Sequence, residues 1–184
     1  MPPQLTNLIT QLHLTIPDLA DIHQALMRLM EPLPPETWLL PVLVLFTLGV
    51  TAVVDAFTGK ISDMAIALGL LIVVAVFGFY GHWQTAAQQL GIGFGAAIAV
   101  WLINQIYFNL TKRDAIGMGD AKWTALAAAM FCFKPVIAAW IVGAWLGIMF
   151  LGLARLLRAR IYQLHFAPFL FVGLLGGFYW FYLR

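Results

Sequence analysis

Charged side chains are scarce in this chain: Asp, Glu, Lys and Arg make up 10% of its 184 residues, whereas hydrophobic residues make up 62%. An ordinary soluble domain carries about a quarter charged residues. So little charge excludes a soluble globular protein and a disordered chain, because this sequence cannot cover a surface that faces water. A nucleic-acid-binding protein is also excluded, because the net charge is only +2 and no basic face is present.

Cysteine is nearly absent as well. The single Cys132 can form neither an internal disulfide nor a thiolate zinc site. The four histidines do not have the spacing of metal ligands, so we expect no metal site and no cofactor. Long apolar runs, by contrast, are abundant, and they predict a polytopic membrane protein.

The apolar runs predict six membrane-spanning helices. A helix needs about 20 apolar residues to cross the ~30 Å hydrocarbon core. The uncharged stretch from Met64 to Leu110 has a polar middle, so we expect it to form two spans. The run from Trp123 to Phe133 is short, so its helix must begin further back and take Lys122 and Asp120 towards membrane depth. We therefore expect an all-α fold with spans at about 38–54, 63–81, 86–110, 120–133, 135–154 and 161–183.

We expect residues 1–37 to be a separate segment ahead of the region 38–184, which contains the expected spans. They lack the basic start and the long apolar run of a signal peptide. Ile22, Leu26, Leu29 and Leu33 recur on one face of an expected helix. This pattern favours an amphipathic helix at the membrane interface. Packing onto the helix bundle or onto a partner remains an alternative.

The distribution of Lys and Arg predicts the orientation in the membrane. With six spans, seven of the ten basic residues lie on one side, in the turn near Lys60 and in the loops 111–122 and 155–160. Positively charged loops stay in the cytoplasm. We therefore expect a multi-pass protein of the plasma (inner) membrane with these loops in the cytoplasm and both termini outside.

Two carboxylates lie at matching ends of expected spans. Asp55 closes the first span and Asp120 opens the fourth, so both are expected at the cytoplasmic side and can meet. Two adjacent carboxyl groups cannot both ionise easily, which yields an acid and a base suited to peptide hydrolysis by water. Gly117 and Gly119 leave room for a substrate backbone beside Asp120. The alternative is that each Asp only caps a helix or is solvated.

Three motifs, taken together, resemble the type IV prepilin peptidase and preflagellin peptidase family of intramembrane aspartic proteases. Residues 117–122 (Gly-Met-Gly-Asp-Ala-Lys) match the Gly-x-Gly-Asp-x-Lys motif of that family. Residues 55–61 match its first aspartate, and residues 167–170 match its Pro-Phe element through Pro168. The resemblance covers about residues 38–184. Ser62 departs from it, because the family usually has proline there.

The resemblance implies that Asp55 and Asp120 are the catalytic pair, with the active site towards the cytoplasm. It implies that the partners are prepilin-like precursors, whose short basic leader precedes a hydrophobic helix that lies in the lipid bilayer. Asp114 stands where many members have an acidic residue that helps to hold the leader, although a solvated loop carboxylate is an equal alternative. Lys122 could favour the charged form of Asp120, or it could be an interfacial anchor.

The resemblance is to a peptidase without the methyltransferase domain of the larger bacterial enzymes, because no paired cysteines are present. Methylation of the cleaved product would then require a separate methyltransferase. Two other functions remain open from the residues alone. Buried acids also suit a small ion- or proton-coupled transporter. An inactive scaffold for pilus assembly would keep substrate binding and lack cleavage.

Overall fold

The computed structural model describes residues 39–114, 116–157 and 164–180 of the chain. Within these residues the chain is all-helical, with six α-helices and no strand. The amphipathic helix expected in residues 1–37 and the boundary of that segment lie outside the described residues. The helices are α3 (Leu39–Thr58), α4 (Asp63–Phe79), α5 (Trp83–Thr111), α6 (Met118–Phe131), α7 (Phe133–Leu156) and α8 (Ala167–Phe178).

Local sequence sets the breaks between the first helices. Gly59 follows α3 with φ +65°, a left-handed conformation that glycine adopts without strain, and its N–H donates to the Asp55 carbonyl oxygen. Ser62 is the N-cap of α4, and its hydroxyl accepts a hydrogen bond from the Ala65 N–H at 3.4 Å. The serine that replaces the expected proline therefore has a role of its own, as a helix cap.

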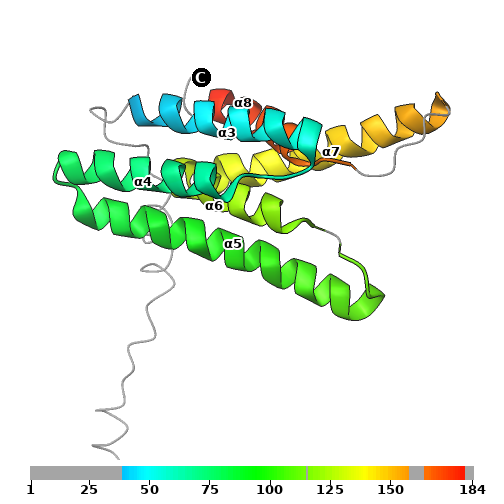
Figure 1. Ribbon diagram of the computed structural model, residues 1–184, viewed down its shortest axis with the longest axis horizontal. Coiled ribbons are helices and arrows are strands. Elements are labelled where there is room, and N and C mark those ends of the chain that lie inside the picture. The colour runs from blue at the N-terminus through cyan, green and yellow to red at the C-terminus, as the bar shows by residue number, and fades with distance from the viewer. Residues whose placement is uncertain (1–38, 115, 158–163, 181–184) are drawn as a thin grey trace, which may run out of the picture. The chain divides into compact units, whose positions relative to one another are not determined.

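Helix α6 is the centre of the bundle. It contacts each of the other five helices, and in Figure 1 it runs between α3 and α5. Every residue from Trp123 to Phe131 is buried, including Trp123 itself, whose indole N–H donates to the Leu48 carbonyl oxygen of α3 at 3.3 Å. The core of this fold is thus an alanine-rich helix that is surrounded by protein.

The expectation of six membrane spans is not supported. Helices α3, α5 and α7, with 20, 29 and 24 residues, are long and apolar enough to cross a membrane. Helices α4 and α8 are apolar but shorter, with 17 and 12 residues. Helix α6 has 14 residues and so reaches about 21 Å, less than the ~30 Å hydrocarbon core. The physical reason is that its apolar side chains pack inside the bundle and do not face lipid.

Small residues allow the helices to approach closely. A Cβ atom added to Gly93 of α5 would lie 2.6 Å from the Ala125 carbonyl oxygen of α6. One added to Gly173 of α8 would lie equally close to the Ala139 carbonyl oxygen of α7. Small residues at such crossings permit backbone contact between apolar helices, as in membrane bundles.

The connections bring several helix ends to one region. Helix α3 ends there, and α4, α6 and α8 begin there, whereas α5 and α7 pass through and continue beyond it. The C-terminal ends of α5 and α7 project away from each other in Figure 1. From Trp101 to Thr111, every α5 residue except Asn104 is exposed, which shows that this end of α5 has little protein around it.

Candidate active site

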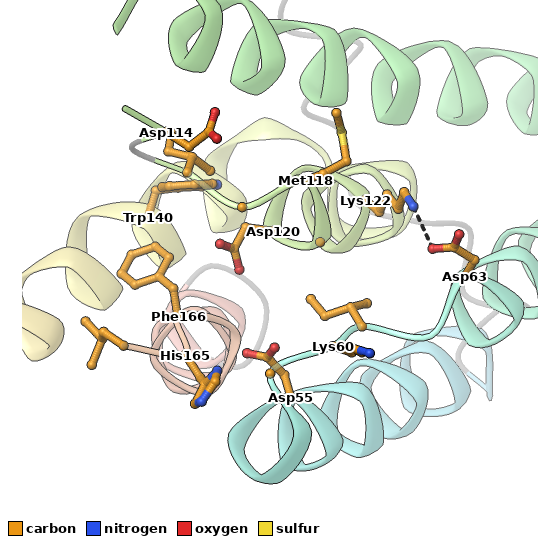
Figure 2. A pocket seen from close by; sticks show the side chains of 16 residues that line it. Asp55, Lys60, Asp63, Asp114, Met118, Asp120, Lys122, Trp140, His165 and Phe166 are labelled. Carbon is orange, nitrogen blue, oxygen red and sulfur yellow. Dashed lines mark hydrogen bonds and ion pairs between the residues drawn. The ribbon is translucent and has the colours of Figure 1, made fainter. Parts of the chain in front are cut away.

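A pocket of about 770 Å³ lies where these helix ends meet. Figure 2 shows the carboxyl groups of Asp55 and Asp120 facing each other across it. These residues come from α3 and α6, which are not consecutive in the chain, so the fold has brought them together as the helix directions suggested. The lining includes Asp55, Gly59, Lys60, Asp63, Asp114, Gly117, Gly119, Asp120, Lys122, Trp140, His165 and Phe166.

Asp55 belongs to the last turn of α3 and is only 6% exposed. A buried carboxyl group needs hydrogen-bond donors or a counter-charge. The backbone N–H of Ala167, the first residue of α8, supplies a hydrogen bond to it. Because free N–H groups at a helix start attract negative charge, the start of α8 is a suitable partner for this carboxylate.

Asp120 lies in the first turn of α6, outside the three helices that are long enough to cross a membrane. Burial, together with a smaller effect of the negative charge of Asp55, raises its pKa from the ordinary 3.8 to about 6. A hydrogen bond from the Gly117 backbone opposes this shift. Asp120 is therefore the member of the pair that keeps its proton more readily.

The two glycines before Asp120 are packed against site residues. A Cβ on Gly117 would lie 3.3 Å from the Asp120 Oδ2 atom. A Cβ on Gly119 would lie 3.2 to 3.3 Å from three side-chain atoms of Ile61, in the link between α3 and α4. Gly119 thus lets the start of α6 lie close to the chain that follows Asp55. Both glycines therefore have a packing role at the start of α6.

Lys122 lines the pocket, but its partner is not Asp120. Its Nζ atom lies 2.6 Å from the Asp63 Oδ1 atom, and both side chains are exposed. This ion pair joins α6 to the start of α4 (Figure 2). Exposed ion pairs contribute little stability, so we assign Lys122 and Asp63 a local role at the pocket edge.

Asp114 also lines the pocket, and it is held by Asn104 of α5. The Asn104 amide donates to the Asp114 Oδ1 atom at 3.0 Å, and its Oδ1 atom accepts from the Ile116 N–H at 3.0 Å. One side chain therefore binds both ends of the turn that leads to Gly117. This geometry fixes the chain ahead of Asp120, whichever role Asp114 has towards a substrate.

Asn104→Leu is expected to loosen this turn. The substitution keeps the approximate size of the side chain but removes both hydrogen bonds, each worth about 1 kcal/mol or more. Backbone amide exchange of residues 112–117, measured by mass spectrometry in detergent, should become roughly tenfold faster. Asn109→Leu, on an exposed part of the same helix, is the matched control and should leave exchange of this segment unchanged. Equal exchange in the wild type and in Asn104→Leu would contradict the role of Asn104.

A second hydrogen-bond chain fixes the start of α6 from the other side. The Trp140 indole N–H of α7 donates to the Thr124 hydroxyl at 3.2 Å, and that hydroxyl donates to the Asp120 carbonyl oxygen at 2.7 Å. Trp140 also lies beside Phe166, with ring centroids 5.4 Å apart. The backbone of Asp120 is therefore held by α5 through its loop and by α7 through Thr124.

Pro168 lies in the first turn of α8, next to the Ala167 N–H that reaches Asp55. Proline is favoured at a helix start because its fixed φ suits the helix and it has no N–H to leave unsatisfied. Pro168 is not part of the pocket lining. Pro168 thus favours a helix start at the point where the Ala167 N–H reaches Asp55.

Three pocket residues, Asp63, Trp140 and His165, are not among the site residues predicted from the sequence, and neither is Asn104, which binds Asp114 beside the pocket. Asn104 carried a usable signal, because an amide side chain inside an apolar run needs a partner. Trp140 carried none, since tryptophan is common in membrane helices. No group of three or more His, Cys, Asp or Glu that could hold a metal ion occurs among the residues that the structure describes.

The arrangement places two carboxyl groups on a shared pocket, and the pKa of Asp120 is raised to about 6. A pair of this kind is suited to acid–base chemistry with water. Comparison with known proteins adds no assignment: no protein-family model, no curated protein and no solved structure matches this chain. The chemistry of the pocket itself must therefore carry the argument about function.

Proposed function

We propose that the chain is an intramembrane aspartic endopeptidase that removes the basic leader from prepilin-like precursors. The observation that carries this proposal is the pair of carboxyl groups, Asp55 and Asp120, which face each other from two non-adjacent helices. The raised pKa of Asp120 adds support, because peptide hydrolysis by an aspartic pair needs one protonated and one ionised carboxyl group. The motif resemblance of residues 117–122 names the substrate class.

In the proposed reaction, the Asp55 carboxylate takes a proton from a water molecule as the water oxygen attacks the peptide carbonyl carbon. Protonated Asp120 donates a hydrogen bond and then its proton to the carbonyl oxygen, which gives a tetrahedral diol. Collapse of the diol returns one hydroxyl proton to Asp120 and breaks the C–N bond. The proton on Asp55 passes to the departing nitrogen, so both carboxyl groups regain their starting forms.

The position of the pocket along the long apolar helices α5 and α7 favours a substrate that is itself embedded in the membrane. Helix α5 continues for seven residues beyond Asn104, about 10 Å, and α7 continues for nine residues beyond Gly147, about 14 Å. Gly147 lies against Leu164 and Phe166, which line the pocket. The two long apolar helices thus extend past the site at their C-terminal ends. In the proposed membrane arrangement, the start of a precursor's hydrophobic helix can reach the site.

The further parts of the proposal follow from the basic loops and the resemblance. We infer a plasma (inner) membrane location with the pocket towards the cytoplasm, where the basic leader of a precursor is found. Six crossings are not required by this proposal, because α6 can carry Asp120 inside the bundle. A separate methyltransferase would act on the product.

The direct test uses the full chain in liposomes with a purified prepilin-like precursor. The proposal expects a product that has lost its leader and has a single new amino terminus. Protonophore-sensitive ion uptake without any cleavage would favour the transporter instead. Stable precursor binding without cleavage would favour the scaffold.

Cleavage is expected to depend on pH with a bell-shaped profile. Asp120 acts as the acid only while protonated, and its pKa of about 6 means that the proton is lost as the pH rises through about 6. At low pH, Asp55 becomes protonated and can no longer accept a proton from water. The kcat/KM value should therefore decline on both sides of a mildly acidic optimum. A profile that stays flat from acid to alkaline pH would contradict the acid–base pair.

A further inference from the structure

His165 lies in the short segment just before α8, on the same side of the pocket as Asp55 (Figure 2). Its ring packs on the backbone of Gly59, because a Cβ atom added to Gly59 would lie 2.6 Å from the His165 Cε1 atom. Gly59 also has φ +65°, which disfavours any other residue. The glycine after α3 thus provides the space for the imidazole, which lines the same pocket as the Asp55 carboxyl group.

The surroundings of the two carboxyl groups differ. Burial disfavours the charged form of both groups, and at Asp55 the charge of His165 and the N–H of Ala167 partly oppose this effect. Asp120 instead faces the negative charge of Asp55, which favours a protonated carboxyl group. A positive charge on His165 therefore acts on one member of the pair and makes the pair asymmetric.

We propose that His165, in its protonated form, is a positioning residue that holds Asp55 as the ionised member of the pair and so leaves Asp120 as the acid. This inference rests on the proposed function and assigns the two roles within it. His165 acts only through Asp55 and exchanges no proton with the substrate.

The other charged groups around the pocket do not replace His165. Lys60 follows α3, but the charge that acts on Asp55 is that of His165. Lys122 is occupied by Asp63, and Asp114 is bound by Asn104. Helix α7 contributes the uncharged Trp140 to the pocket, and the described part of α8 has no charged side chain.

The first test compares His165→Gln, which removes the charge, with His165→Lys, which keeps a cation. In liposomes containing the precursor, the acid limb of the kcat/KM profile should move to higher pH by about one to two units in His165→Gln. His165→Lys should bring the limb back towards its wild-type position. His82→Gln, a histidine in the distant turn between α4 and α5, should leave the profile unchanged. If both His165 variants lost kcat/KM equally and the acid limb of the profile did not shift, the inference would be overturned. Such a result would indicate a packing role for His165.

A second test does not depend on peptidase activity. Dicyclohexylcarbodiimide modifies protonated carboxyl groups in apolar surroundings, and peptide mapping locates the modified residue. Across a pH series, wild-type protein should be modified at Asp120, and His165→Gln should in addition be modified at Asp55. Modification of Asp55 to the same extent in both proteins would overturn the inference. Asp55 could become modified in His165→Gln even though the wild type cleaved no precursor. In that case the proposed function would fail, and the role of His165 towards Asp55 would stand.

Discussion

Asparagine in place of Asp120 or of Asp55 is expected to lower kcat/KM for precursor cleavage by about a thousandfold or more. An amide has nearly the shape of a carboxyl group, but it cannot pass a proton between water, the peptide and the leaving nitrogen. Loss of a positioned acid or base costs about 10²- to 10⁴-fold in rate. Initial rates of the two variants in liposomes, measured beside the wild type, check this expectation.

Unfolding measurements separate this loss of activity from a loss of structure. The folded-state pKa of Asp120 is about 6, above its ordinary 3.8, so folded Asp120 binds a proton that the unfolded chain has already released in this window. Wild-type stability therefore falls as the pH rises from about 3.8 to about 6. Asp120→Asn has no carboxyl group that titrates at this position, so it does not lose stability over this pH range. Its Tm should therefore exceed that of the wild type above about pH 6. The Tm values of the two proteins should become equal near pH 3.8, where the Asp120 carboxyl group is protonated in the folded protein.

Near-normal cleavage by either asparagine variant would show that the pair is not the catalytic one. A Tm of Asp120→Asn below that of the wild type at neutral pH would indicate a structural role for the carboxylate. The combination of higher stability and lost activity is the result that a functional buried acid predicts.

Gly173→Ala is expected to be the most damaging conservative substitution in the bundle. The added Cβ would lie 2.6 Å from the Ala139 carbonyl oxygen and 2.9 Å from the Ala139 Cα. These are backbone atoms of α7, so no side chain can rotate away, and the helices must separate. Overpacking of this kind costs about 1 to 3 kcal/mol. Because α8 also carries the Ala167 N–H to Asp55, cleavage should fall as well.

Gly176→Ala provides the matched control, because it makes the same change in the same helix. No atom lies within 4 Å of its added Cβ. Alanine is a better helix former than glycine by about 1 kcal/mol, so this variant should be as stable as the wild type or more stable. Thermal unfolding in detergent compares the two variants. Equal Tm values for them would contradict the close contact between α7 and α8.

The helical content followed from the sequence, because most of the apolar runs are long and all of them are bounded by polar or turn residues. The meeting of Asp55 and Asp120 followed from the parity of the helices, which needs no knowledge of their packing. The number of membrane-spanning helices did not follow from the sequence. An apolar run such as 123–133 has the same composition whether lipid or protein surrounds it, and only the tertiary contacts of α6 distinguish the two.

Partner choice within the site was also beyond the sequence. Lys122 is two residues from Asp120 in the chain, yet its side chain pairs with Asp63, fifty-nine residues away. Residues two apart on a helix point in different directions, which the motif spacing does not express. Similarly, the contact of His165 with Gly59 joins distant segments and depends on how the helices pack, and the hydrogen bond of Asn104 with Asp114 depends on the path of the loop after α5.

The measurement that tests the central claim most directly is the amino-terminal sequence of the product formed from a prepilin-like precursor in membranes that contain this protein. The account predicts one new terminus, directly after the leader and before the hydrophobic helix, in membranes with the wild type. It predicts uncut precursor in membranes with Asp55→Asn or Asp120→Asn. An unprocessed precursor with the wild type, or the same new terminus with both variants, would contradict it.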